Sequence, residues 1–162
     1  GFGSGAGSVK YNEFKFANRG SFWSTNVNGM EAMFTYFPTE VESINISSDI
    51  SSRLKDRLEI DITSDFNDTY ADSIALAQYQ MGLVLNNFNM FARNGFAGKN
   101  PSNFTVITCK DATNFVPVIY FKSSNSTNIF FEDNCIIAEA ATKSDVIRIK
   151  DRLVYGILGV MG

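Results

Sequence analysis

The stretch that decides the fold is LEIDITSDFNDTYADSIALAQYQMGLVL, residues 58–85. Its opening residues alternate apolar and polar side chains, and this period of two predicts a β-strand. The side chains expected on one face of this strand are Leu58, Ile60 and Ile62. From about Thr69 the apolar spacing becomes helical, which predicts a largely buried helix that continues to Asn94 and stops at Asn94-Gly95.

The run from Asn103 to Cys109 predicts the next strand, so this part of the chain is expected to form a strand–helix–strand unit. Such a unit prefers parallel strands joined by a right-handed crossover. Further strands are predicted at residues 9–16, 116–122, 128–133 and 135–140. Short polar breaks separate the last three of these runs, and such breaks favour antiparallel neighbours.

Turn and cap residues locate the remaining elements. Asn28-Gly29 separates two strand-like runs, and both residues accept a positive φ, so a type I′ hairpin is predicted there. A short helix capped by Ser47 or Ser48 is also predicted. A final helix is expected to begin at a cap formed by Ser144.

These elements place the chain in the α/β class, with an α+β-like layout. We expect a mixed β-sheet with one strand–helix–strand crossover, an N-terminal β-hairpin and a C-terminal helix packed on the sheet. Residues 1–8 are rich in Gly and Ser, which is typical of a flexible tether. Residues 9–162 are expected to form a single globular domain, because a chain of this length builds one well-formed core.

Acidic residues surround the junction between the predicted strand and helix. Ligands bind beyond the carboxyl ends of parallel strands, where Asp65 and Asp68 follow the first strand and Lys110 and Asp111 follow the second. Three carboxylates with an ammonium group are suited to a divalent cation together with a phosphate or sugar. The alternative is a helix start, because a side-chain oxygen of Asp65 or Asp68 accepts a free backbone N–H at the first turn.

The composition excludes several classes of function. The chain of 162 residues has no histidine, which removes the Ser-His-Asp and Cys-His nucleophile pairs and the common His-based zinc sites. Its net charge of -3 does not indicate a basic surface of the kind that binds nucleic acid. The basic cluster of Arg148, Lys150 and Arg152 is interrupted by Asp145 and Asp151. No cofactor is expected, and no apolar run approaches the roughly 20 residues that span a bilayer.

Two cysteines lie in strand-like runs. Cys109 ends one run and Cys135 begins another. If the two strands are neighbours, a disulfide would close the intervening loop and stabilise the fold by about 3 to 4 kcal/mol. The alternative is a pair of buried free thiols.

Four Asn-X-Ser/Thr triplets are candidates for N-glycosylation. Their acceptor residues are Asn45, Asn67, Asn103 and Asn125. The alternative is simple richness in Asn, Ser and Thr, which by itself yields about two or three such triplets.

Three stretches of the chain are KYNEFKF at 10–16, ITCKDATNFVPVIYF at 107–121 and NCIIAEAATKSDVIRIKDRLVYGILGVM at 134–161. Together they resemble small archaeal proteins that carry an N-terminal membrane anchor. The resemblance covers most of the chain in layout, and the group brings no assigned activity or site residue. It implies an extracytoplasmic head held by an anchor.

We therefore expect a non-enzymatic extracytoplasmic or cell-surface interaction module, which is membrane-anchored or secreted. Its partner is expected to be a protein or a glycan, and its membrane contact is expected to run only through an anchor that precedes Gly1. One alternative is a ligand-binding protein or metal-assisted enzyme that uses the acidic cluster. The other is a subunit of a surface assembly, in which an exposed strand edge pairs with a neighbour.

Overall fold

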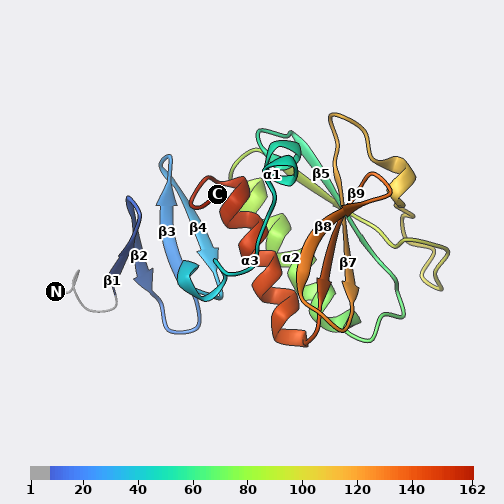
Figure 1. The fold of residues 1–162 in the computed structure, drawn as a ribbon, viewed down its shortest axis with the longest axis horizontal. Helices are drawn as coiled ribbons and strands as arrows, with labels where there is room; N and C mark the ends of the chain where they lie inside the picture. The colour runs from blue at the N-terminus through green and yellow to red at the C-terminus, as the bar shows by residue number, and fades with distance from the viewer. Residues whose placement is uncertain (1–7) are drawn as a thin grey trace.

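Two β-sheets enclose a pair of helices in the computed structural model, which describes residues 8–162. Figure 1 shows the four-stranded sheet on the left, helices α2 and α3 in the middle and the five-stranded sheet on the right. The tether expected at residues 1–8 lies outside the described residues, apart from Ser8, which begins the first strand. The α/β class, the N-terminal hairpin and the crossover are confirmed.

The N-terminal sheet is an antiparallel meander of four strands. These strands are β1 (Ser8–Tyr11), β2 (Phe14–Asn18), β3 (Trp23–Val27) and β4 (Met30–Phe34). The single strand predicted over 9–16 is wrong, because Asn12 takes a φ of 51° and turns the chain between β1 and β2. The predicted hairpin at Asn28-Gly29 is confirmed, with φ values of 50° and 85°.

The second sheet has the order β6-β5-β7-β9-β8. Its strands are β5 (Glu59–Ser64), β6 (Phe91–Asn94), β7 (Val118–Ser123), β8 (Asn128–Glu132) and β9 (Cys135–Ala140). β5 pairs in parallel with both β6 and β7, and β7 pairs in parallel with β9. Only β8 runs antiparallel, so the expected antiparallel pairing is correct for β8 and β9 and wrong for β7.

Three α-helices complete the fold of residues 8–162. They are α1 (Ser48–Leu54), α2 (Ala71–Asn86) and α3 (Lys143–Ile157). The Ser47 hydroxyl accepts a hydrogen bond from Ile50 N, as predicted for α1. The predicted cap at Ser144 is wrong, because the Thr142 hydroxyl accepts the hydrogen bond from Asp145 N instead.

The long helix predicted to reach Asn94 ends earlier, and its last residues form a strand. α2 ends at Asn86, and Asn89 then takes a φ of 61°, which breaks the helix. The following residues pair with β5 as the edge strand β6, so the crossover unit is β5–α2–β6. The strand predicted from Asn103 to Cys109 is therefore wrong, and the only pairing of that run among the described residues is an isolated bridge between Phe96 and Val106.

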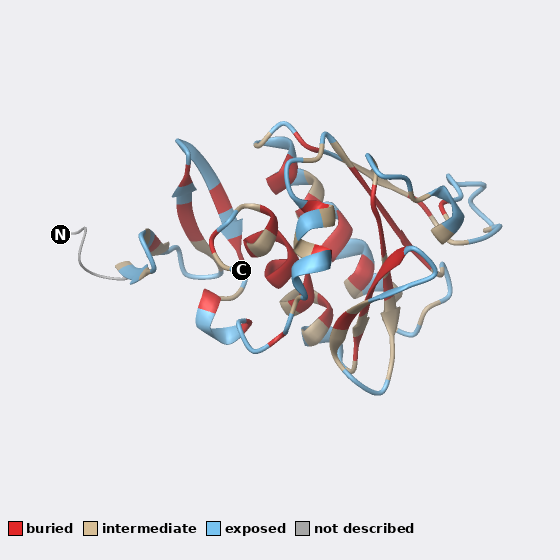
Figure 2. Ribbon diagram, turned by 45° about the horizontal axis from the view of Figure 1, so that its top comes forward, coloured by how far each residue is buried: buried red, intermediate tan, exposed pale blue. Residues whose placement is uncertain are grey.

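The main core lies between the two sheets, where both sheets pack against α2 and α3. In Figure 2 the buried segments gather on the helices and on the strands that flank them. The Phe34 ring of β4 stacks on the Tyr155 ring of α3 with centroids 3.8 Å apart. On the opposite face of the five-stranded sheet, a smaller cluster forms beneath the connection that spans residues 95–117.

Polar side chains of α3 fix the connection between the two sheets. Asp151 accepts a hydrogen bond from Tyr36 N at 2.8 Å, and Tyr155 donates its hydroxyl to Tyr36 O at 2.6 Å. Arg152 donates to Ile44 O at 2.7 Å. Because buried polar groups are costly unless they are paired, these contacts hold the connection in one conformation.

Candidate functional site

The acidic residues after β5 bond to the turn before α2 and to the neighbouring strand β7. The two carboxylate oxygens of Asp68 accept hydrogen bonds from Tyr70 N at 2.7 Å and from Ser123 N at 3.0 Å. The Asp65 carboxylate accepts a hydrogen bond from the Tyr120 hydroxyl at 2.6 Å. Burial and this carboxylate raise the pKa of Tyr120 above its ordinary value. The bond from Tyr70 N lies in the turn before α2, whereas the Asp65 carboxylate contacts β7, and among the described residues no side-chain hydrogen bond caps the helix at its N-cap residue Tyr70.

The other two residues of the predicted cluster lie at the opposite end of the sheet. Lys110 and Asp111 follow Cys109, which is bonded to Cys135 at the amino end of β9. Asp111 caps its own turn by accepting a hydrogen bond from Thr108 N at 2.8 Å. Since β5 and β9 point in the same direction, the structure does not bring Lys110 and Asp111 together with the acidic residues after β5. Within residues 8–162, no group of three His, Cys, Asp or Glu side chains is arranged to hold a metal ion.

Glu59 and Asp61 form a second carboxylate pair, on the face of β5 opposite to the core residues Ile60 and Ile62. Arg93 contacts both of its members, Asp61 at 2.8 Å and Glu59 at 3.5 Å. A hydrogen bond with Asp61 and burial raise the pKa of Glu59. The shared guanidinium makes this cluster a structural tie between β5 and the edge strand β6.

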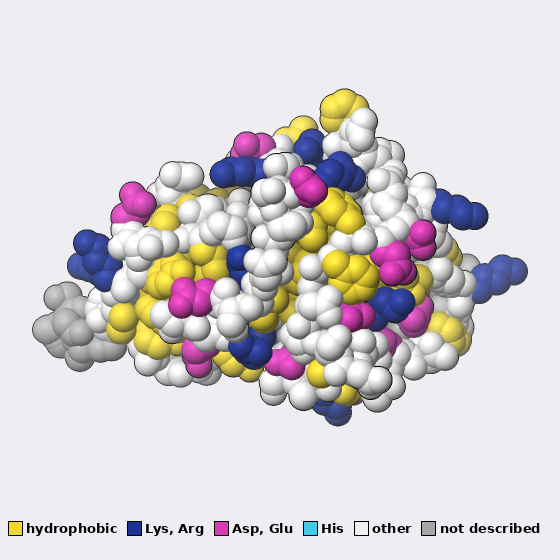
Figure 3. All heavy atoms as spheres, in the orientation of Figure 1, with side chains coloured by type: hydrophobic (Ala, Val, Ile, Leu, Met, Phe, Trp, Pro, Cys, Tyr) yellow, Lys and Arg dark blue, Asp and Glu magenta, His cyan; other side chains and the backbone are white. Residues whose placement is uncertain are grey.

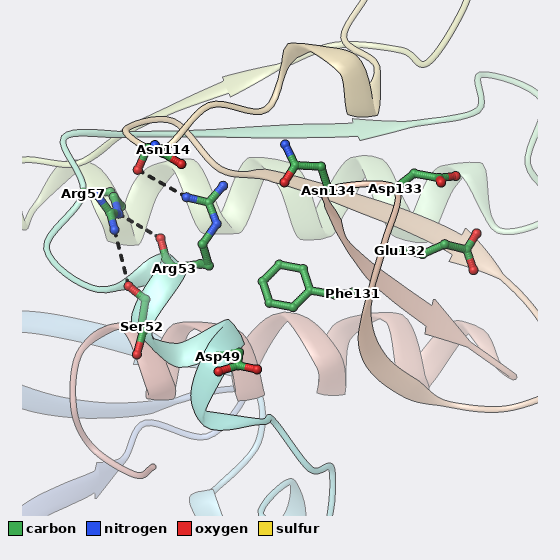
Figure 4. Close-up of a pocket in the computed structure, with 9 residues that line it drawn as sticks. All are labelled: Asp49, Ser52, Arg53, Arg57, Asn114, Phe131, Glu132, Asp133 and Asn134. Atoms are coloured by element: carbon green, nitrogen blue, oxygen red, sulfur yellow. Dashed lines mark hydrogen bonds between the residues drawn. The ribbon is translucent and has the colours of Figure 1, made fainter.

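An open, polar cleft of about 760 Å³ lies between α1 and the β8–β9 turn. Figure 4 shows Phe131 pointing into it and the two guanidinium groups along one side. Arg53 donates to the backbone carbonyls of Thr113 and Asn114, and Arg57 donates to Arg53 O at 2.8 Å. Arg53 thus ties α1 to the connection 95–117, and each guanidinium group uses two of its five N–H donors in backbone contacts. Figure 3 shows charges of both signs mixed over this face of the molecule.

An apolar groove lies between α2 and the N-terminal sheet, and it is named here the α2 groove. Its lining residues are Ser21, Phe22, Met33, Phe34, Thr35, Leu76, Tyr79, Gln80, Leu83, Val84 and Lys150. On the helix side, Leu76 and Leu83 are each 48 % exposed and Tyr79 is 63 % exposed. On the sheet side, Met33 is 40 % exposed. Its volume of about 310 Å³ suits one or two side chains of a partner.

Two polar groups reach the lining of the α2 groove. The Gln80 Oε1 atom is buried and has no hydrogen-bond donor among residues 8–162. Lys150 is 2 % exposed, and its ammonium lies 2.5 Å from the Asp151 carboxylate. Burial raises the pKa of Asp151, although the neighbouring Lys150 and the Tyr36 N–H oppose this shift. The apolar lining of the groove thus includes one residue whose shielded side-chain oxygen lacks a donor within the described chain and one buried cation with three N–H donors.

The sequence pattern gave a partial signal for this groove. The spacing of Leu76, Tyr79 and Leu83 places them on one side of α2. The helical apolar spacing predicts a largely buried helix, but Leu76 and Leu83 on this side of α2 are half exposed. Lys150 was recognisable only as part of a basic cluster, whereas the structure buries it against Asp151.

The disulfide between Cys109 and Cys135 is present, with a Cα–Cα distance of 5.1 Å. It ties the connection 95–117 to the amino end of β9. Structural disulfides persist in oxidising, extracytoplasmic compartments and are rare in the cytosol. The disulfide therefore indicates an extracytoplasmic setting.

All four acceptor asparagines of the Asn-X-Ser/Thr triplets are exposed. They are Asn45, Asn67, Asn103 and Asn125. Exposure is what a glycosyltransferase requires of an acceptor, and glycosylation of these residues stays a prediction.

Comparisons with protein-family models, curated proteins and solved structures give no match for this chain. Over residues 8–162, no helix combines the length and the apolar character that crossing a bilayer requires.

Proposed function

We propose that this chain is the extracytoplasmic head of an anchored or secreted protein, and that it acts by recognising a partner protein through the α2 groove. The disulfide and the four exposed glycosylation triplets support the extracytoplasmic setting. The resemblance to anchored archaeal proteins supports an anchor. An apolar surface of this kind, partly rimmed by polar residues, is typical of an interaction site.

The occupant that fits the groove is a tyrosine side chain on a peptide segment of the partner. Its ring would pack against Leu76, Leu83 and Met33, which now face solvent. Its hydroxyl would donate a hydrogen bond to Gln80 Oε1 and accept one from the Lys150 ammonium. The single observation that carries this proposal is the buried Gln80 acceptor without a donor at the wall of an apolar groove.

The cost of leaving a buried acceptor unpaired sets the expected difference in affinity between ligands. A buried acceptor without a partner costs about 1–3 kcal/mol, and a ligand that supplies the donor recovers part of this free energy. A hydroxylated aromatic ligand should therefore bind more tightly than the same ring without its hydroxyl group. Each 1.4 kcal/mol of difference corresponds to a tenfold change in Kd.

The test uses p-cresol, the side-chain analogue of tyrosine, and toluene as the matched ligand without the hydroxyl group. Each is titrated into the oxidised, isotope-labelled protein, and the backbone amide shifts are followed by NMR. We expect the shifts to centre on residues 76–84, with p-cresol binding about tenfold more tightly than toluene.

Two variants separate the contributions. Gln80→Leu should abolish the preference for p-cresol over toluene, because it removes the unpaired acceptor. Leu58→Lys is the control, since Leu58 is 82 % exposed and lies outside the groove. Shifts spread equally over other exposed apolar residues, or equal affinity for the two ligands, would contradict the proposal.

A further inference from the structure

Three aromatic side chains form an exposed cluster near the carboxyl ends of β5 and β6. This Phe66 cluster consists of Phe66, Phe96 and Phe104. The centroids of Phe66 and Phe96 are 6.3 Å apart, and those of Phe96 and Phe104 are 5.7 Å apart, both with edge-to-face geometry. Phe66 is 42 % exposed and Phe104 is 49 % exposed. The cluster is thus an ordered apolar surface that lies outside the α2 groove.

Hydrogen bonds fix the backbone segments that carry Phe96 and Phe104. Phe96 N donates to Thr105 O at 2.8 Å, and Ile107 N donates to Phe96 O at 2.8 Å. The Asn100 side chain exchanges two hydrogen bonds with the backbone of Phe104, at 2.8 and 3.1 Å. A ligand that packs on the rings therefore has little ordering cost to overcome.

Two of the four glycosylation triplets adjoin this cluster directly. Asn67 follows Phe66, and these are the two central residues of a turn closed by Asp68 N donating to Asp65 O at 3.1 Å. Asn103 precedes Phe104, and its φ of 52° places it in the left-handed region at the end of a second turn. Both asparagines are exposed.

The other two triplets lack aromatic neighbours of this kind. Asn45 lies between Ile44 and Ile46, which pack against the main core. Asn125 lies between Ser124 and Ser126. The chain therefore contains its own pair of matched control sites.

We propose that Asn67 and Asn103 carry N-linked glycans whose core sugars cover the Phe66 cluster. The apolar C–H face of a pyranose ring packs on an aromatic ring, and an exposed cluster of phenylalanines supplies that surface. In the transfer, the asparagine Nδ2 forms a bond to the anomeric carbon of a lipid-phosphate-linked oligosaccharide. The bond from that carbon to the phosphate oxygen breaks, the lipid phosphate leaves, and Nδ2 loses one proton.

The position of the triplets favours glycans over a protein partner as the occupant. A glycan on either asparagine is bulky and hydrophilic, and it would block the approach of a flat protein surface to the neighbouring ring. This inference rests on the extracytoplasmic setting of the proposed function. It does not depend on recognition through the α2 groove, so the two fail in different experiments.

The experiment produces the whole chain in a secretory host that performs N-glycosylation, and it maps site occupancy by mass spectrometry of peptides. Thermal unfolding and binding of a fluorescent apolar dye are then measured before and after enzymatic removal of the glycans. We expect occupancy at Asn67 and Asn103, a Tm about 2–4 °C lower after removal, and increased dye binding.

Four further variants test whether the glycans beside the Phe66 cluster are the ones that stabilise the fold. Thr69→Ala and Thr105→Ala remove the two triplets, and together they should reproduce the Tm and dye binding of the deglycosylated protein. The controls Asn45→Gln and Asn125→Gln should change neither quantity.

A double variant of the rings tests the packing itself. In the combined Phe66→Ser and Phe104→Ser variant, the triplets remain and glycan removal should no longer change the Tm. The inference is overturned by empty Asn67 and Asn103 sites, or by the same Tm shift on deglycosylation with and without the two rings. Concentration-dependent association through the cluster in the secreted protein would also overturn it, because the occupant would then be another protein.

Discussion

Loss of the disulfide between Cys109 and Cys135 should lower the free energy of unfolding by several kcal/mol. The two residues are 26 positions apart, so the bond removes the entropy of a loop of that length from the unfolded chain. In the chain-entropy model this corresponds to about 3.5 kcal/mol at 25 °C. The equilibrium constant for unfolding should therefore rise by about 300-fold.

The assay is urea unfolding followed by the fluorescence of Trp23, the one tryptophan of the chain, which packs against Phe37 at 4.9 Å. Oxidised protein, reduced protein and the double variant Cys109→Ala with Cys135→Ala are compared. The reduced protein keeps both sulfur atoms and so isolates the effect of the bond from the loss of packing at the fully buried Cys135. A reduced protein as stable as the oxidised one would refute the reasoning.

Hydrogen exchange locates the effect within the fold. Reduction should speed amide exchange in the connection 95–117 more than in β7 or β9, because the bond ties that connection to the amino end of β9. Thr63 donates to Ile107 O at 2.6 Å, a contact that does not involve the disulfide, so protection near Ile107 should be the last to fall on reduction. Uniform loss of protection across the sheet would contradict this order.

Three further substitutions have defined outcomes. Tyr155→Phe leaves the carbonyl of Tyr36 without its donor and should lower the free energy of unfolding by about 1–3 kcal/mol in urea titrations. Gly95→Ala places a Cβ 2.7 Å from the Ile107 side chain and should lower the Tm measured by calorimetry. Burial alone would raise the pKa of Asp145, but hydrogen bonds from neighbouring side chains hold this pKa below its ordinary value. The ionised Asp145 carboxylate therefore stabilises the fold above about pH 4, and this stabilisation is lost as the pH falls through the folded pKa. Asp145→Asn should therefore flatten the fall of the urea midpoint below pH 4.

The parts of the fold that were predictable are those set by local chemistry. Asn28-Gly29 specified its hairpin because both residues tolerate a positive φ. Ile60 and Ile62 are fully buried in β5, as the alternating pattern predicted. Leu58 is 82 % exposed because the strand begins one residue after it.

The parts that were not predictable depend on contacts distant in sequence. The residues after Asn89 keep a helix-like apolar spacing, and only their pairing with β5 makes them the strand β6. The sequence also did not indicate that the strands divide between two sheets, since strand-like runs look alike before they are paired. The separation of Asp65 from Lys110 has the same origin, because the connection between them crosses the sheet to its amino end.

The sequence predicted the α2 groove only in part. The apolar spacing on α2 was visible, but the sheet leaves Leu76 and Leu83 uncovered, and no local pattern indicates which stripe remains exposed. The buried contact of Lys150 with Asp151 arises from the packing of α3 beneath β4.

Selection from a displayed library of random peptides tests recognition through the α2 groove most directly. The oxidised protein is the bait, and the Leu83→Lys variant, which places a charge at the groove wall, removes peptides that bind elsewhere. We expect the remaining peptides to share a tyrosine and to lose affinity for the Gln80→Leu variant. Peptides that bind the wild-type and Leu83→Lys proteins equally well, or an enriched set without tyrosine, would contradict the account.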